Sequence, residues 1–246
     1  MTLLEAGYII DAKNKHLHWM VYSTSEDWDK YQKAPLIAHY CSMVKTIFES
    51  MFDTDYINSH KNLAVLYSVD GPITFRENNL IFLSVEHNPC QCIYQFSHEL
   101  CHFMIPGKVC KNFQWLEESL CMLSSLHTLT VIMESEEDEK IKNVIYQYIK
   151  CVITDASKPI EDATLSNFIE NNIVALSSEP CKDNYSYNKA IALQLHPIFQ
   201  EYRKLWNIIP YLNELTDAMT LKEAFGHLGY ASGIPDATSK LISLMC

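Results

Sequence analysis

The chain has 246 residues, 48% of them hydrophobic, with only 6 glycines and 9 prolines, which excludes disordered, collagen-like and coiled-coil classes. Its 30 acidic and 19 basic residues give a net charge of -11, which repels phosphate backbones, so we expect no nucleic-acid partner. No apolar stretch approaches the roughly 20 residues of a membrane-spanning helix, and the first residues lack a basic flank with a long apolar run. We therefore expect a protein that is neither exported nor held in a membrane.

Nine cysteines form an odd set without regular spacing, in a chain too large to need disulfide bonds for stability. We expect reduced thiols and a cytoplasmic location. Cys90 and Cys92 form a CxC pair, but no second pair stands at the spacing of a zinc finger, so the pair alone does not indicate a metal site.

The first third of the chain predicts β-structure around one helix, because short apolar runs with turn residues between them flank a segment with helical spacing. The expected elements are strand–turn–strand over 7–23 with the turn at Asn14-Lys15, a helix over 34–52, strands over 63–68 and 80–85, and a turn at 70–72.

After Pro89 the spacing of apolar residues is helical. The acidic run 134–139 is expected to be a solvated loop and helix start, since acidic side chains favour the positive end of a helix. We predict an α+β fold over 1–246, with a mixed β-sheet and helices in a first lobe (1–105) and a mainly helical second lobe (106–246). The expected helices cover 90–104, 113–131, 139–153, 164–176, 185–206 and 220–228.

Residues 98–102 read His-Glu-Leu-Cys-His, an HExxH motif. Histidines at i and i+4 lie about 40° apart on a helix, so both imidazoles can bind one cation, with the glutamate near a water at that cation. This spacing suits Zn²⁺. The apolar residues of 93–104 cluster opposite the histidines, so we expect a helix with one buried face and one face open to a cleft.

A catalytic zinc ion needs a third protein ligand and an open position for water. The next expected helix, for which Asn112 is the expected N-cap, offers two adjacent carboxylates, Glu117 and Glu118, and helical geometry does not decide between them. Cys121 lies one turn after Glu118 and could approach the metal, but we expect it to pack as a buried thiol.

The HExxH motif followed by Trp-Leu-Glu-Glu-Ser (115–119) resembles the HExxH and WLxEG motifs of the gluzincin metallopeptidases, especially those of aminopeptidase N and leukotriene A4 hydrolase type. The resemblance implies a zincin-like fold and a Zn²⁺ cofactor held by His98, His102 and Glu118. It also implies that Glu99 is the catalytic base that activates the attacking water. A strand before the HExxH helix lies at the sheet edge in zincins and pairs with extended substrate, and the run 79–85 matches that position.

A second stretch, Tyr-Asn-Lys-Ala-Ile-Ala-Leu (187–193), is similar to the family's Tyr-x-Lys-Gly-x-Ala-Leu, in which the tyrosine hydroxyl stabilises the oxyanion. The resemblance gives this role to Tyr187, with Tyr185 as the alternative. Ser119 and Ala190 stand where the family has glycine, and the spacer between the zinc motifs is shorter. The family's Gly-x-Met-Glu-Asn element, which reads a free amino terminus, is missing, so aminopeptidase specificity is not implied.

These features predict a zinc metallopeptidase, a gluzincin-like hydrolase that acts on a peptide or protein substrate. The same centre would also serve the hydrolysis of a small amide or ester. The alternative from another class is a zincin-fold binding or regulatory module whose metal site is structural or degenerate.

Overall fold

A computed structural model describes residues 7–10, 19–22, 33–52, 56, 62–85, 88–162, 164–178 and 182–245. The chain divides into two compact units, Met1–Met104 and Ile105–Cys246, and each is described by itself. The turn expected at Asn14-Lys15 and two of the nine cysteines, Cys181 and Cys246, lie outside the described residues. No helix among those ranges is long and apolar enough to cross a membrane.

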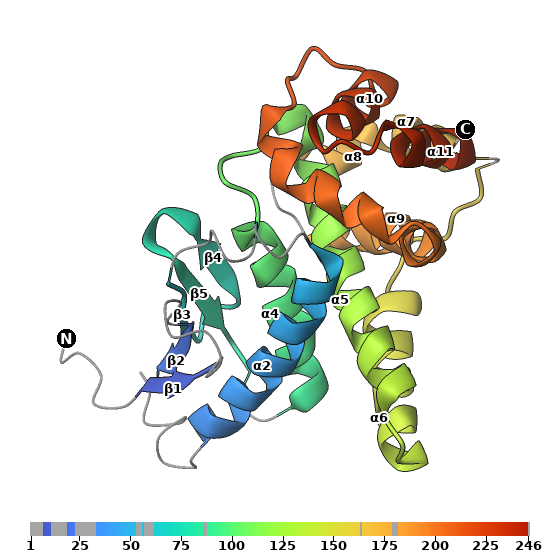
Figure 1. Ribbon diagram of the computed structural model, residues 1–246. Coiled ribbons are helices and arrows are strands. Elements are labelled where there is room, and N and C mark those ends of the chain that lie inside the picture. The colour runs from blue at the N-terminus through green and yellow to red at the C-terminus, as the bar shows by residue number, and fades with distance from the viewer. Residues whose placement is uncertain are drawn as a thin grey trace. The chain divides into compact units, whose positions relative to one another are not determined.

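The first unit is built on a five-stranded mixed sheet with the order β1-β2-β3-β5-β4 (Figure 1). The three inner strands are parallel to one another, and the two outer strands, β1 and β4, run antiparallel to their neighbours. The strands are β1 (Gly7–Ile9), β2 (Met20–Tyr22), β3 (Ala64–Tyr67), β4 (Ile73–Phe75) and β5 (Leu80–Leu83).

The strand order corrects one expectation. The run 79–85 forms β5, which lies between β3 and β4, so it is not the edge strand. Its apolar sequence, with Ile81 and Leu83 fully buried, is typical of an inner strand. The edge is β4, a strand that the sequence pattern did not predict, and on its outer side it has no partner strand among the residues that the structure describes.

Two helices of the first unit, α2 (Lys33–Met51) and α4 (Pro89–Phe103), pack against the sheet and against each other (Figure 1). α2 contacts β1 and β2, whereas α4 contacts β4 and β5. Asn88 caps the N-terminus of α4 by accepting a hydrogen bond from the backbone N–H of Gln91, and Pro89 occupies the first turn. The chain therefore places the HExxH helix directly against the β4 edge of the sheet.

A short 3₁₀ turn, η1 (Arg76–Asn78), and Asn79 connect β4 to β5. Asn79 has φ 53°, which puts it in the left-handed region that asparagine tolerates better than most residues. This turn reverses the chain, so that β4 returns antiparallel to β5 with Thr74 opposite Ile81.

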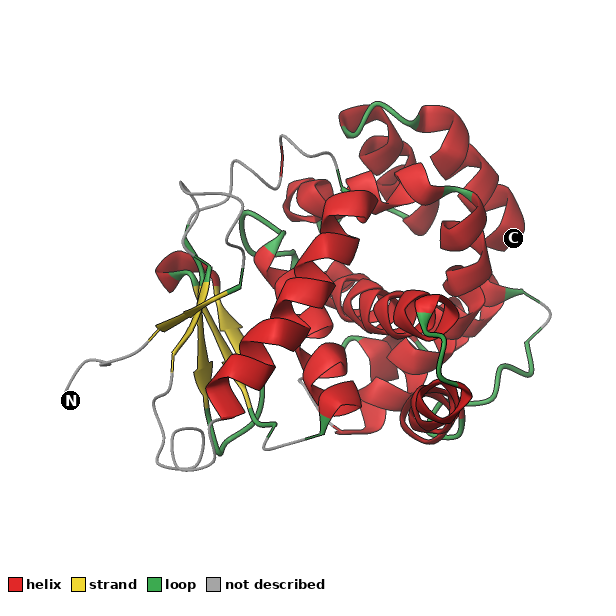
Figure 2. Cartoon of the chain, turned by 60° about the horizontal axis from the view of Figure 1, so that its bottom comes forward, coloured by secondary structure: helices red, strands yellow, loops and turns green. Residues whose placement is uncertain are grey.

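The second unit is helical (Figure 2), and its helices α5 and α9 pack against each other. Together with the mixed sheet of the first unit, it confirms the α+β prediction. Its helices are α5 (Gln114–Ser135), α6 (Glu139–Ile149), α7 (Leu165–Asn171), α8 (Ile173–Leu176), α9 (Lys182–Glu201), α10 (Leu221–Ala231) and α11 (Pro235–Met245), with 3₁₀ segments η2 (Lys111–Phe113) and η4 (Arg203–Glu214) and a π-helical segment η3 (Lys150–Thr154).

The helical prediction missed α11 (Pro235–Met245) and is wrong in three further details. The helix expected over 164–176 is broken at Asn172 into α7 and α8, and the helix expected over 185–206 ends at Glu201, before the 3₁₀ segment η4. Asn112 does not cap α5, because it lies in η2 and donates its side-chain N–H to the carbonyl of Asp217.

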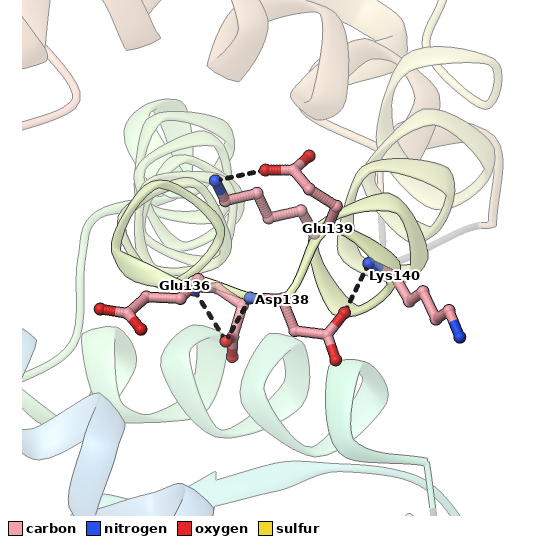
Figure 3. Close-up of polar contacts among 6 residues, drawn as sticks. Glu136, Asp138, Glu139 and Lys140 are labelled. Atoms are coloured by element: carbon pink, nitrogen blue, oxygen red, sulfur yellow. Dashed lines mark hydrogen bonds and ion pairs between the residues drawn. The ribbon is translucent and has the colours of Figure 1, made fainter.

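The acidic run 134–139 begins in the last turn of α5, and its other residues form the loop to α6 and the start of that helix, as expected for them (Figure 3). Oε1 of Glu136 accepts from the backbone N–H groups of Glu137 and Asp138, and Oδ1 of Asp138 accepts from that of Lys140. Asp138 is thus the N-cap of α6. These carboxylates stabilise the helix start.

Candidate metal centre

His98 and His102 project from the C-terminal half of α4, with Glu99 between them in sequence. Their Nε2 atoms are 3.2 Å apart, and their rings are nearly perpendicular at 71°. Two nitrogens that each lie about 2.0–2.1 Å from a tetrahedral zinc ion are about 3.3 Å from each other. The spacing of the two imidazoles therefore fits two ligands of one zinc ion.

α4 is more buried than expected. His98 is 8% exposed and Glu99 5%, and most of the residues on both faces of the helix are buried. The expectation of one open face is wrong for this helix. Two turns before His102, Gln95 fixes α4 to the chain after β5, because its amide bonds both the backbone N–H and the hydroxyl of Ser84.

The carboxylate of Glu99 has a partner on the edge strand. The hydroxyl of Thr74 in β4 lies 2.7 Å from Oε2 of Glu99 and 2.8 Å from its backbone carbonyl oxygen. A buried carboxylate needs such donors, because loss of hydration costs free energy that only hydrogen bonds or charges offset.

Arg76, two residues after Thr74, reaches the second histidine. Its Nε donates to the backbone carbonyl of His102 at 2.6 Å, and its Nη2 lies 3.4 Å from Nδ1 of the same residue. A cation at the last carbonyls of a helix also interacts favourably with the helix dipole. β4 and the turn after it thus hold α4 at the glutamate and at the second histidine.

Sequence reasoning missed Thr74 and Arg76. The signal was present, because Ile-Thr-Phe-Arg (73–76) alternates apolar and polar residues, which is typical of a short strand with one polar face. Three residues are too few for such a pattern to stand out from a loop.

The two carboxylates of the second motif lie in the first turns of α5, in the second unit. Glu117 is buried and Glu118 is half-buried, with Trp115 and Leu116 packed in the core. Cys121, also on α5, is fully buried, as expected. Glu117, Glu118 and Cys121 lie within about one turn of the same helix.

His98 and His102 offer imidazole donors in the first unit, and Cys121 offers a thiol donor on α5 of the second unit. Imidazole and thiolate donors together favour Zn²⁺ and other borderline or soft transition metals over Mg²⁺ or Ca²⁺. The burial of Cys121 agrees with the packing role expected for it, and its approach to the metal, the other role named for it above, stays a prediction. Glu118 stays the ligand that the motif predicts.

Tyr187 and Tyr185 lie on α9. The ring of Tyr187 is half-buried, 6.0 Å from that of Phe168, and Nζ of Lys158 lies 5.7 Å from its centre. Tyr185 is 43% exposed. The choice between the two tyrosines as the oxyanion donor stays a prediction.

A second pair of histidines lies in the second unit, with His127 on α5 and His196 on α9. The rings of His127 and His196 are 5.9 Å apart, and the ring of His127 is 5.2 Å from that of Trp206. The pKa of both histidines is lowered to about 4, mainly by burial and, for His127, also by the neighbouring His196 and Arg203. Both imidazoles are therefore neutral at pH 7, and that of His127 is packed in the core.

Comparisons of the chain with protein-family models, with curated proteins and with solved structures find no match. The candidate centre is therefore defined by its own residues in the first unit: two imidazoles at ligand spacing and a buried carboxylate held by Thr74.

Proposed function

We propose that this chain is a zinc-dependent peptidase with a gluzincin-like, zincin-type architecture. His98, His102 and Glu118 are the proposed metal ligands, and Glu99 is the proposed base. The observation that carries the proposal is the 3.2 Å separation of the two Nε2 atoms on a helix whose intervening glutamate is buried and hydrogen-bonded.

Zinc supplies Lewis acidity, which lowers the pKa of water and polarises a carbonyl group. Glu99 takes a proton from the attacking water at its carboxylate and later gives it to the leaving amine. Tyr187 donates its phenolic O–H to the oxyanion, a role that suits a phenol because it adds no competing base at neutral pH.

The substrate we propose is an extended peptide. The outer edge of β4 has no partner strand among the described residues, and its flanking side chains Ile73 and Phe75 are 47% and 44% exposed. A peptide that pairs with such an edge gains main-chain hydrogen bonds, and apolar neighbours add contacts for alternate side chains. β4 replaces the run 79–85 in this role.

The setting we propose is the cytoplasm. The seven cysteines in the described part of the chain form no disulfide bond there, and six of them are buried or half-buried. Free thiols in such number are typical of a reducing compartment.

The decisive experiment compares wild-type protein with Glu99→Gln. The purified wild type should contain one zinc ion per chain and cleave members of a broad peptide library, whereas the variant should keep its zinc and lose hydrolysis. Glu49→Gln, at a carboxylate on α2 that pairs with Lys45, is the matched control and should cleave like the wild type. Wild-type protein with stoichiometric zinc and no cleavage of any library member would refute the peptidase.

The alternative is a binding or regulatory module with a structural zinc site, and a second potential ligand on α5, the thiol of Cys121 one turn after Glu118, favours it. If Glu118 and Cys121 both bound the metal beside the two histidines, four protein ligands would complete a tetrahedron and leave no position for water. A closed site of this kind stabilises a fold and does not hydrolyse.

A further inference from the structure

The hydroxyl of Thr74 is placed to control which oxygen of Glu99 can act. It lies 2.7 Å from Oε2 and 2.8 Å from the backbone carbonyl oxygen of the same residue, so its one hydrogen serves acceptors of a single glutamate. Thr74 is half-buried, and Glu99 is 5% exposed, so water has little access to this hydrogen bond.

Strand and helix both limit the freedom of this contact. The backbone of Thr74 is paired with Ile81 of β5, and the neighbouring Arg76 anchors the last turn of α4 at the carbonyl of His102. The β-branched side chain of threonine also has few rotamers, so the hydroxyl costs little entropy to hold in place.

We propose that Thr74 is a positioning residue that fixes the carboxylate of Glu99 by holding Oε2, so that Oε1 is the oxygen that accepts the proton. This inference rests on the proposed function of Glu99 as a base. A carboxylate that rotates freely spends part of its time in unproductive orientations, whereas a held carboxylate has the orientation already set.

The test compares Thr74→Val with Thr74→Ser. Valine keeps the shape and the strand preference of threonine but removes the hydroxyl, and serine keeps the hydroxyl. We expect zinc content to stay at the wild-type level in both, kcat to fall about 10- to 100-fold in Thr74→Val with KM changed less than about threefold, and Thr74→Ser to restore kcat to within about threefold.

Thr46→Val is the matched control, because it removes a threonine hydroxyl from an exposed site on α2. It should leave kcat unchanged. The proposal is overturned if Thr74→Val has wild-type kcat while folded and loaded with zinc. It is equally overturned if Thr74→Val and Thr74→Ser lose the same activity, since the strand and not the hydroxyl would then be what matters.

A second measurement separates failure of this inference from failure of the proposed function. Urea unfolding of Thr74→Val, Glu99→Met and the double variant forms a cycle that requires no substrate, and methionine leaves no side-chain oxygen to accept from the hydroxyl. If the hydroxyl acts on the carboxylate, Thr74→Val should lower the urea midpoint clearly in the wild-type background and much less beside Glu99→Met. Equal decreases in the two backgrounds would overturn the positioning role even if the protein is an active peptidase, and unequal decreases would support the contact even if it is not.

Discussion

The hydroxyl of Ser119 lies 3.2 Å from Oδ1 of Asn188 and 2.7 Å from the carbonyl oxygen of Trp115. Ser119 is fully buried and Asn188 is 3% exposed. The contact joins the α5 motif that contains Glu118 to the α9 stretch that contains Tyr187. A serine at this position, where the resembling family has glycine, therefore has a structural reason, because glycine offers no hydroxyl to Asn188.

Ser119→Ala should lower the free energy of unfolding by about 1–2 kcal/mol, because it leaves the buried amide of Asn188 short of a partner. Ser119→Gly should cost about 1 kcal/mol more, since glycine is a poor helix former. Urea unfolding checks both values. In an Asn188→Ala background the effect of Ser119→Ala should shrink, and an undiminished effect would mean that the two side chains are not coupled.

The choice of the third metal ligand predicts different results for three variants of α5. Under the proposed function, Glu118→Gln should weaken zinc binding more than about 100-fold, which exceeds the usual loss when a residue that only hydrogen-bonds a metal ligand is changed. Glu117→Gln and Cys121→Ser should keep the metal. Zinc content after competition with a chelator measures this.

Cobalt substitution gives an independent check on the thiol. A Co²⁺-loaded protein in which Cys121 binds the metal should show a thiolate-to-metal charge-transfer band that Cys121→Ser abolishes. Loss of zinc in both Glu118→Gln and Cys121→Ser, together with that band, would favour the closed structural site over the peptidase.

Acid should destabilise the second unit through His127 and His196. Their pKa values are about 4 in the folded protein, whereas an unfolded chain protonates histidine near pH 6.5. The contribution of the two neutral histidines to the free energy of unfolding is therefore fully present above about pH 6.5. It is lost as the pH drops toward 4, and nothing more is lost below that pH. The loss is at most about 3 kcal/mol for each histidine and smaller for the half-buried His196.

Urea midpoints at pH 7.5 and pH 4.5 test this dependence. His196→Asn removes one of the two titrating groups and should flatten the profile, whereas His39→Asn, at an exposed residue of α2, should leave it unchanged. A profile that His196→Asn does not alter would place the acid sensitivity elsewhere.

Two glycines of α10 should respond to alanine in opposite ways. A Cβ at Gly229 would lie 1.8 Å from the hydroxyl oxygen of Thr238 in α11, whereas a Cβ at Gly226 would meet nothing within 4 Å. Gly229→Ala should therefore destabilise the chain by about 1–3 kcal/mol, and Gly226→Ala should stabilise it by up to about 1 kcal/mol. Thermal unfolding compares the two variants. Equal changes in stability would mean that α10 and α11 are not tightly packed at Gly229.

Local signals allowed most helices to be predicted from the sequence. α4 and α5 start within a residue of their expected first residues, because Asn88, Pro89 and the apolar spacing mark the start of α4 and set its length. α11 was missed, and the breaks at Asn172 and Glu201 were not expected, because each depends on packing between segments distant in the chain.

The candidate site was predictable only in part. The HExxH spacing fixes both imidazoles on one helix, so their proximity follows from helical geometry alone. Thr74 could not be placed against Glu99, because strand order depends on pairing between segments distant in the chain, and a helical wheel does not rank Cys121 against Glu118.

Asn79 gives this arrangement an evolutionary consequence. Its left-handed backbone, φ 53°, ends the turn that brings β4 back along β5 and so sets Thr74 and Arg76 against the HExxH helix. Diverged relatives that keep the centre should therefore carry asparagine, aspartate or glycine at this point, preceded five residues earlier by threonine or serine. The asparagine position of this signature lies nineteen residues before the first histidine of the motif. The signature would distinguish true relatives of this chain from unrelated proteins in which HExxH occurs by chance.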